Sequence, residues 1–160
     1  TTTCPAGSCI PGKREFPKDL TKIVIAHDLP YAAQASPHNW KDLIGKAKKG
    51  FDTPGPAFIN VISPCPRGWR HDGSQTIAMS KLAVETCVWP LYEFENGKWR
   101  LTGESLRIAE GTKEKKPVSD WLNSQGRFKH LMKGKFTSVA DDIQKNIDAK
   151  WEQLQKLCKM

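Results

Sequence analysis

The sequence lacks long apolar runs and an amino-terminal signal, and each absence excludes a class of protein. None of its 160 residues lies in a window approaching the roughly 18 consecutive apolar residues of a transmembrane helix, so we expect no membrane contact. Residues 1–5, TTTCP, contain no initiator Met, no basic stretch and no apolar stretch, so they are not a signal peptide. We therefore expect the chain to be entered partway through a longer one.

Cysteine is sparse and ungrouped. The five cysteines are an odd number without a secretory signal, which argues against a disulfide framework and favours reduced thiols in the cytoplasm. Cys87 and Cys158 lie in apolar patterns and are expected to pack as small hydrophobic side chains. Cys4 and Cys9 have the first spacing of a plant-type iron–sulfur motif, but Gly12 stands where the third thiol would be. Loop thiols are therefore favoured over ligands for this pair.

Several catalytic motifs are absent. The glycines never form a phosphate-binding loop or a dinucleotide fingerprint, and no G-x-S-x-G elbow occurs. The four histidines are isolated, without an H-E-x-x-H pair, and are expected to be ordinary core or surface residues: His27, His38, His71 and His130.

The composition is that of a globular domain, with 38% hydrophobic and 26% charged residues. The formal net charge is +8 and comes mainly from lysines spread over several expected elements. This spread favours a solvated surface over an acidic protein partner, and no nucleic-acid motif is present.

Hydrophobic periodicity predicts alternating elements in the first half of the chain. Residues 1–16 are expected to be loop, and residues 18–28 fit either a strand or a helix with Leu20, Ile23, Val24 and His27 on one face. Strands are expected at 31–36 and 57–62. Between them, a helix at 39–50 should end at Gly50 and direct four apolar residues into the core: Trp40, Leu43, Ile44 and Ala47.

The second half is expected to contain helices and one hairpin. Ser74 should cap a helix that runs to about Thr86, and Asn96-Gly97 is a strong hairpin signal. Short helices are expected at 117–123 and 127–132. A final helix should start at Ser138 with Asp141 and carry one apolar stripe: Val139, Ile143, Ile147, Trp151, Leu154 and Cys158.

These elements predict an α/β fold. If residues 18–28 are helical, helices and strands alternate over residues 18–87, which is typical of parallel strands joined by crossover helices. A hairpin and a helical tail follow. Two central strands are few for a parallel sheet, so we expect the chain to form part of a larger sheet.

Cys65 is the most distinctive candidate for a functional residue. It stands between two prolines in SPCPRGW, directly after an expected strand. Pro64 and Pro66 restrict the backbone and remove two donors, so the thiol should lie on a stiff, non-helical turn. From the residues alone, Cys65 is either a structural thiol or a metal ligand whose partners come from elsewhere.

Three segments resemble a known family. They are GPAFINVISPCPRGW at 55–69, KLAVETCVWPLYE at 81–93 and KPVSDWLNSQGRFKHL at 116–131. In this order they closely resemble the β subunit of pyruvate:ferredoxin oxidoreductase (pyruvate synthase). Residues 1–7 also resemble a stretch downstream of that family's cofactor-binding Asn-Thr-Gly segment. The match therefore extends from residue 1 to about residue 131.

The resemblance implies a fold and a reaction. Residues 1–95 would be the C-terminal part of a thiamine-diphosphate-binding α/β domain, and residues 96–160 the rest of the hairpin and a helical extension. The intact enzyme would convert pyruvate and coenzyme A to acetyl-CoA and CO₂ and pass electrons to ferredoxin. It would use thiamine diphosphate, Mg²⁺ and a [4Fe-4S] cluster. Cys65 would be one ligand of that cluster, as both a metal-binding and a cofactor-binding residue.

The family's Gly-Asp-Gly and Asn-Thr-Gly segments and its three other cluster cysteines are not in this sequence. We therefore expect these 160 residues alone to be inactive and to bind no cofactor, and expect the upstream part of the β subunit and the other subunits as partners. Two alternatives remain: a related 2-oxoacid substrate (2-ketoisovalerate or 2-oxoglutarate), or a basic binding module without catalysis. Subunit contacts are a further role, beside core packing, for Trp89, Trp99, Trp121 and Trp151.

Overall fold

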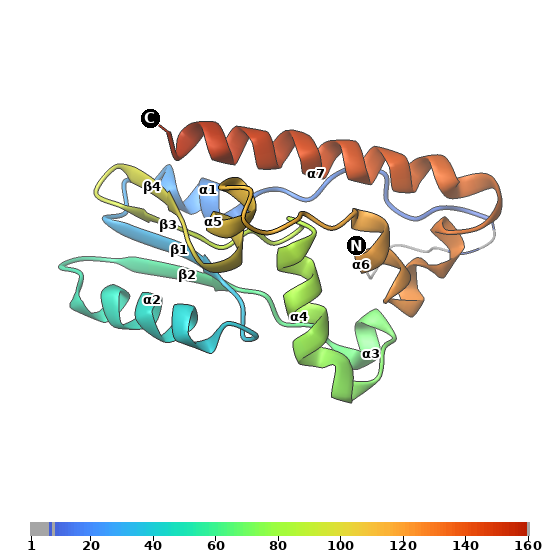
Figure 1. Ribbon diagram of the computed structural model, residues 1–160, viewed down its shortest axis with the longest axis horizontal. Coiled ribbons are helices and arrows are strands. Elements are labelled where there is room, and N and C mark those ends of the chain that lie inside the picture. The colour runs from blue at the N-terminus through green and yellow to red at the C-terminus, as the bar shows by residue number, and fades with distance from the viewer. Residues whose placement is uncertain (1–6, 8, 160) are drawn as a thin grey trace.

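A four-stranded mixed sheet forms the centre of the chain (Figure 1). The computed structural model describes residue 7 and residues 9–159. The strands are β1 (Tyr31–Ala35), β2 (Ala57–Val61), β3 (Tyr92–Glu95) and β4 (Lys98–Leu101), in the spatial order β2-β1-β3-β4. The first two strands pair in parallel, and the other two pairings are antiparallel.

The expected alternation of helices and strands is confirmed. Residues 18–28 contain a helix, α1 (Leu20–Ile25), and α2 (Trp40–Asp52) connects the two parallel strands. After β2 come α3 (Pro66–Trp69), a 3₁₀ turn η1 (Gly73–Gln75) and α4 (Thr76–Glu85). Because β1 and β2 are parallel and joined by a helix, they form the predicted crossover unit.

The predicted hairpin forms and belongs to the same sheet. Asn96 and Gly97 have φ of 48° and 81°, as the two central residues of a type I′ turn require. β3 pairs with β1 in the register Ala33↔Glu93, so the hairpin extends the central sheet on the side away from β2. The division of the chain near residue 95 remains a prediction.

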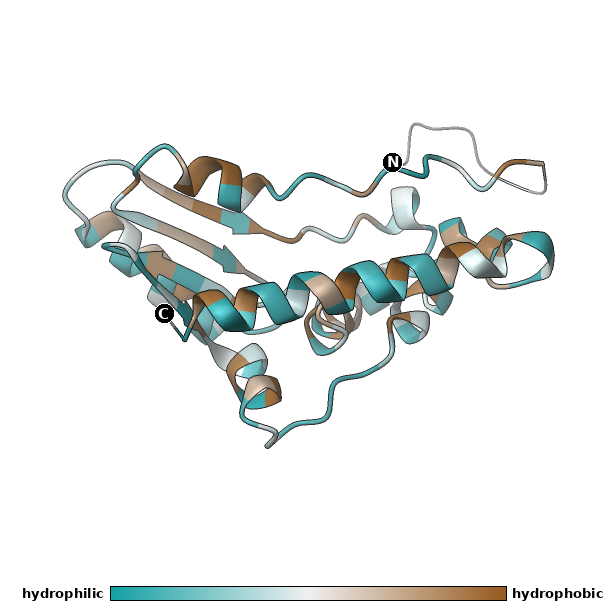
Figure 2. Cartoon of the chain, turned by 90° about the horizontal axis from the view of Figure 1, so that it is seen from above, coloured by the Kyte–Doolittle hydropathy of each residue, from teal (hydrophilic) through white to brown (hydrophobic). Residues whose placement is uncertain are grey.

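Shorter helices and a long C-terminal helix complete the chain. They are α5 (Gly103–Ala109), α6 (Val118–Asn123), the 3₁₀ turns η2 (Gly126–Leu131) and η3 (Gly134–Phe136), and α7 (Thr137–Leu157). The expected helix at 127–132 is thus a 3₁₀ helix. Polar and apolar residues alternate along α7 (Figure 2), and its expected stripe faces the core, with Trp151 and Leu154 fully buried. None of the helices in the described part of the chain combines the length and the apolar character that crossing a membrane requires.

Helix α2 is present, but its predicted core face was wrong. Trp40 and Ile44 are 60% and 58% exposed, whereas Lys46 is buried. The Lys46 ammonium donates to Gln34 O (2.9 Å), Asp42 Oδ2 (2.6 Å) and Thr102 Oγ1 (2.8 Å). Burial is tolerated because every ammonium proton has an acceptor. The helix also continues past Gly50 to Asp52.

Helix ends and one further helix face also differ from expectation. On α1 the buried residue is Thr21, and Leu20 and Ile23 are 52% and 44% exposed. Ser74 lies in η1, where Asp72 accepts its amide hydrogen, so Ser74 does not cap α4. Helix α7 starts at Thr137 without a side-chain cap, so the Ser138 capping box is also wrong.

Two apolar clusters hold the elements together. One joins the hairpin, α5 and α7 through these buried residues: Cys87, Tyr92, Leu101, Ile108, Trp151 and Leu154. The other lies behind the end of β2 and joins it to α4 and α6 through Ile62, Ala83, Val118, Trp121 and Leu122. Trp121 and Trp151 are therefore core residues, and the exposed tryptophan is Trp40.

Candidate functional site

Cys65 lies on an exposed turn at the carboxyl end of β2. Its backbone is extended (φ −97°, ψ 112°) and it caps α3, whose first residue is Pro66. The Gly68 amide donates to Cys65 Sγ at 3.3 Å. Pro64 is buried while Cys65 is exposed, so the turn is anchored before the thiol and presents the sulfur to the outside. The stiff turn predicted from the two prolines is confirmed.

Aromatic contacts hold this turn from behind. The Trp69 ring, at the end of α3, packs edge-on against Trp121 with a centroid distance of 5.7 Å. The Arg127 guanidinium lies 4.4 Å from the Trp69 ring centroid and 4.6 Å from that of Phe128. Burial lowers the pKa of Arg127 to about 10, and its Nε donates to Gln125 Oε1 at 2.8 Å. The α3 turn is therefore fixed to α6 and η2.

Two glycines permit the close packing of the same turn. A Cβ at Gly68 would lie 3.4 Å from Cys65 Sγ, so a larger residue would crowd the thiol. A Cβ at Gly126 would lie 2.8 Å from both Arg70 Cβ and Arg70 O. Arg70 ends α3 in the left-handed conformation (φ 59°), and its carbonyl accepts from the Gly126 amide at 3.1 Å. The turn and η2 thus meet at the backbone itself.

A polar chain at the carboxyl end of β1 was not predicted. Ser36 Oγ lies 2.8 Å from His38 Nδ1, and His38 Nε2 lies 3.5 Å from Glu104 Oε2. Burial lowers the pKa of His38, although Glu104 opposes this shift. Ser36 is fully buried, so this chain stabilises the loop after β1 and does not present a nucleophile. Because β1 and β2 are parallel, this loop and the Cys65 turn leave the same edge of the sheet.

The other cysteines are not brought to Cys65 as a metal site. Within residues 7 and 9–159, no group of three or more His, Cys, Asp or Glu side chains could hold a metal ion. Cys9 is exposed, and Cys4 lies outside the described residues. Cys87 is buried, which raises its pKa to about 12, and burial also raises the pKa of Cys158. These last two are the packed thiols that the sequence predicted.

The remaining histidines make local contacts. His71 Nδ1 lies 2.8 Å from Asp72 O, and His27 is exposed on the loop after α1. His130 Nε2 lies 2.8 Å from Pro11 O and joins η2 to the amino-terminal segment. None of these three approaches Cys65 as part of a metal-binding group in the described part of the chain.

A basic groove of about 1930 Å³ runs between the amino-terminal segment and the helices α6 and α7. Arg70, Arg127 and Lys129 are among the several cations that line it, beside the rings of Trp121 and Phe128. Lys150 Nζ bridges its two sides by donating to Pro17 O at 3.2 Å. The lining has the charge to attract an anionic partner.

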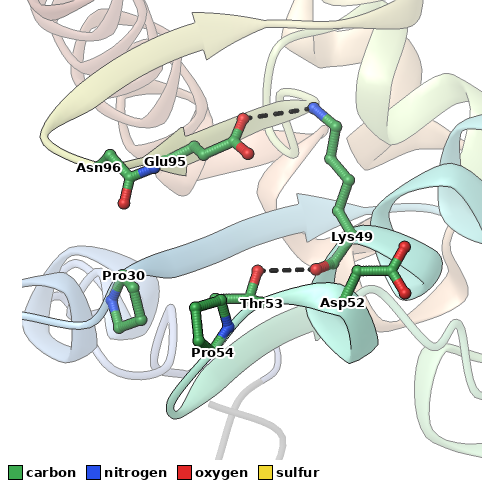
Figure 3. Close-up of a pocket in the computed structure, with 7 residues that line it drawn as sticks. All are labelled: Pro30, Lys49, Asp52, Thr53, Pro54, Glu95 and Asn96. Carbon is green, nitrogen blue, oxygen red and sulfur yellow. Dashed lines mark hydrogen bonds and ion pairs between the residues drawn. The ribbon is translucent and has the colours of Figure 1, made fainter.

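A second, smaller pocket of about 330 Å³ lies at the opposite end of the strands (Figure 3). Its one lysine, Lys49, donates to Glu93 Oε1 at 2.6 Å and lies 3.5 Å from Glu95 Oε2. Figure 3 also shows Thr53, whose hydroxyl donates to the Lys49 carbonyl at 2.7 Å. The cation is neutralised by its neighbours, so this pocket stabilises the end of α2 and offers no charge to a ligand.

Comparison with known proteins gives a consistent set of relatives. Pyruvate synthase subunit PorB of Thermotoga maritima is 41% identical over 155 residues, which cover 96% of this chain and 46% of that protein. Ketoisovalerate oxidoreductase subunit VorB of Pyrococcus horikoshii is 39% identical over 160 residues, which cover 100% of this chain and 49% of that protein. PorB of Methanocaldococcus jannaschii is 41% identical over 154 residues, 96% of this chain and 48% of that protein. The chain thus spans about half the length of these relatives. No protein-family model matches it.

Proposed function

Because this chain is homologous over nearly its whole length to 2-oxoacid oxidoreductase subunits of the PorB and VorB type, we propose that it is part of the β subunit of a pyruvate:ferredoxin oxidoreductase. The intact enzyme would oxidise and decarboxylate pyruvate, form acetyl-CoA and CO₂, and pass the electrons to ferredoxin. In this proposal the 160 residues supply the parallel strands β1 and β2, the Cys65 turn and the helical tail. Thiamine diphosphate and Mg²⁺ would be held mainly by the rest of the subunit.

The observation that carries the proposal is the exposed Cys65 thiol on a fixed turn at the end of a parallel strand. A thiolate is the usual ligand of iron–sulfur clusters, and hydrogen bonds to sulfur adjust their potential. Cys65 already accepts one such bond from the Gly68 amide. The turn fits a cluster ligand in chemistry and exposure, and the other three thiolates would come from residues beyond this chain. The cluster would carry electrons one at a time.

The substrate is proposed as pyruvate, and the relatives define the alternative. PorB and VorB relatives are 41% and 39% identical to this chain, so overall similarity alone does not separate pyruvate from 2-ketoisovalerate. The basic groove supports ferredoxin, an acidic electron carrier, as partner through its charge. The expected cytoplasmic location remains a prediction from the cysteine content.

A chimeric subunit can test the function. In the chimeric PorB subunit, the matched region of Thermotoga maritima PorB is replaced by this 160-residue chain, and the other subunits of that enzyme are coexpressed. We expect ferredoxin reduction that requires coenzyme A and is faster with pyruvate than with 2-ketoisovalerate. Faster reduction with 2-ketoisovalerate would reassign the substrate. An assembled enzyme that reduces ferredoxin with neither 2-oxoacid would refute the proposed function.

A further inference from the structure

The sheet is open on the side of β2. This strand is the last in the order β2-β1-β3-β4, and no strand of the described part of the chain pairs with its outer side. The Ile62 amide donates to Ala35 O at 3.3 Å, so it faces β1. Backbone groups alternate along a strand, so the amides of Ile59 and Val61 face the outer side. Val61 is also 40% exposed.

Helix α2 directs an apolar stripe toward the same side. Successive residues of a helix point in directions about 100° apart, because a turn takes about 3.6 residues. Lys49 reaches Glu93 on β3, and Gly50 faces Ala57 and Ile59 of the sheet. Continuing round the helix in the same sense, Phe51 points past β2, and it is 90% exposed.

The stripe extends along the whole helix. Trp40 and Ile44 precede Phe51 by eleven and seven residues, positions that share its face, and they are 60% and 58% exposed. Figure 1 shows α2 below the sheet on the side of β2. On the other face of the sheet, Leu20 of α1 is 52% exposed and lies on the side of its helix opposite Lys22, which reaches Gln153 of α7. Apolar side chains therefore flank the open strand on both layers.

We infer that the outer side of β2 and the Trp40–Ile44–Phe51 stripe form one docking surface, and that its occupant is the part of a PorB-type subunit that lies outside the matched half. The occupant adds a strand beside β2 and a helix against the stripe of α2. The relatives are about twice as long as this chain, so they contain enough polypeptide to cover the surface. Exposed apolar patches of this size and an unpaired edge strand are otherwise liabilities for a folded protein.

This inference rests on the proposed function for the identity of the occupant. It also has a consequence for Cys65, which follows β2 by four residues. A polypeptide that pairs with β2 reaches the carboxyl end of that strand beside the Cys65 turn. The docking surface thus brings the remainder of the subunit to the exposed thiol.

Hydrogen exchange and thermal unfolding test the surface in the chimeric PorB subunit and in the isolated chain. We expect the Ile59 and Val61 amides to exchange at least tenfold more slowly in the chimeric PorB subunit. Phe51→Glu should lower the Tm of the chimeric PorB subunit by about 4 °C or more, since it places a charge in a newly buried apolar contact. The same change should leave the Tm of the isolated chain nearly unchanged, because Phe51 is exposed there. Ile44→Glu should behave in the same way.

Leu106→Glu provides the matched control. Leu106 is 40% exposed on α5, which follows the opposite edge strand β4, so the substitution should affect both proteins equally. Equal amide exchange in the two proteins, or equal Tm shifts from Phe51→Glu, would overturn the inference. A chimeric PorB subunit that does not fold would also overturn it, since the two parts must join through this surface. Protected amides in a chimeric PorB subunit that binds no iron would leave the docking surface standing and refute the proposed function.

Discussion

Replacing Gly126 with alanine tests whether the Cys65 turn is fixed by its contact with η2. The new Cβ would lie 2.8 Å from Arg70 Cβ and from Arg70 O, and one of these atoms is backbone. Neither can move aside without shifting the end of α3, which is already held in a left-handed conformation at Arg70. Overpacking of this kind costs about 1–3 kcal/mol of unfolding free energy.

An opposing effect must be subtracted from that cost. Alanine restricts the unfolded chain more than glycine does and, where the native backbone accepts it, stabilises by about 0.4–1 kcal/mol. Gly73 measures this effect alone, because a Cβ there would meet no atom within 4 Å. We therefore expect Gly73→Ala to be neutral or slightly stabilising, and Gly126→Ala to be destabilising. Urea unfolding followed by tryptophan fluorescence measures both. Equal unfolding free energies for the two variants would refute the fixed turn.

Three further predictions concern other buried groups. Lys46→Met should lower the unfolding free energy in urea by about 3–5 kcal/mol, because it leaves the Asp42 carboxylate unpaired in a buried place, and adding Asp42→Asn should recover part of the loss. A thiol reagent at pH 8 should modify Cys65 rapidly and Cys87 only on unfolding, since burial raises the pKa of Cys87 to about 12; equal labelling by mass spectrometry would contradict this. Burial lowers the pKa of His38, so the unfolded chain binds more protons just below the ordinary value of 6.5. The unfolding free energy should fall as the pH drops from 6.5 toward the lowered pKa, and His38→Gln should flatten this part of the profile.

Local patterns predicted most of the elements. The Asn96-Gly97 turn, the prolines around Cys65 and the periodicity of α7 each depend on neighbouring residues alone, so the sequence was sufficient for them. The segment that became α1 could not be decided, because its β-branched residues suit a strand as well as a helix. Helix starts at Ser74 and Ser138 failed for a similar reason, since other residues completed the first turn.

The main error, the face of α2, has a physical cause. Periodicity identifies the apolar side of a helix but not what covers it. In this chain the apolar side faces past the sheet edge, and Lys46 can be buried only because Thr102, 56 residues away, supplies an acceptor. The contact between His38 and Glu104 was missed in the same way, since the two residues are far apart in sequence. Such long-range polar pairs are set by the fold and leave no local signal.

The most direct test of the central claim is the iron content of the chimeric PorB subunit with Cys65→Ala, compared with Cys9→Ala. Both cysteines are exposed, so the comparison separates ligation from the loss of an accessible thiol. If Cys65 is a cluster ligand, its variant should lose about four iron atoms per subunit and the matching visible absorption. The Cys9 variant should keep both. Full iron content and an unchanged spectrum in the Cys65 variant would contradict the account.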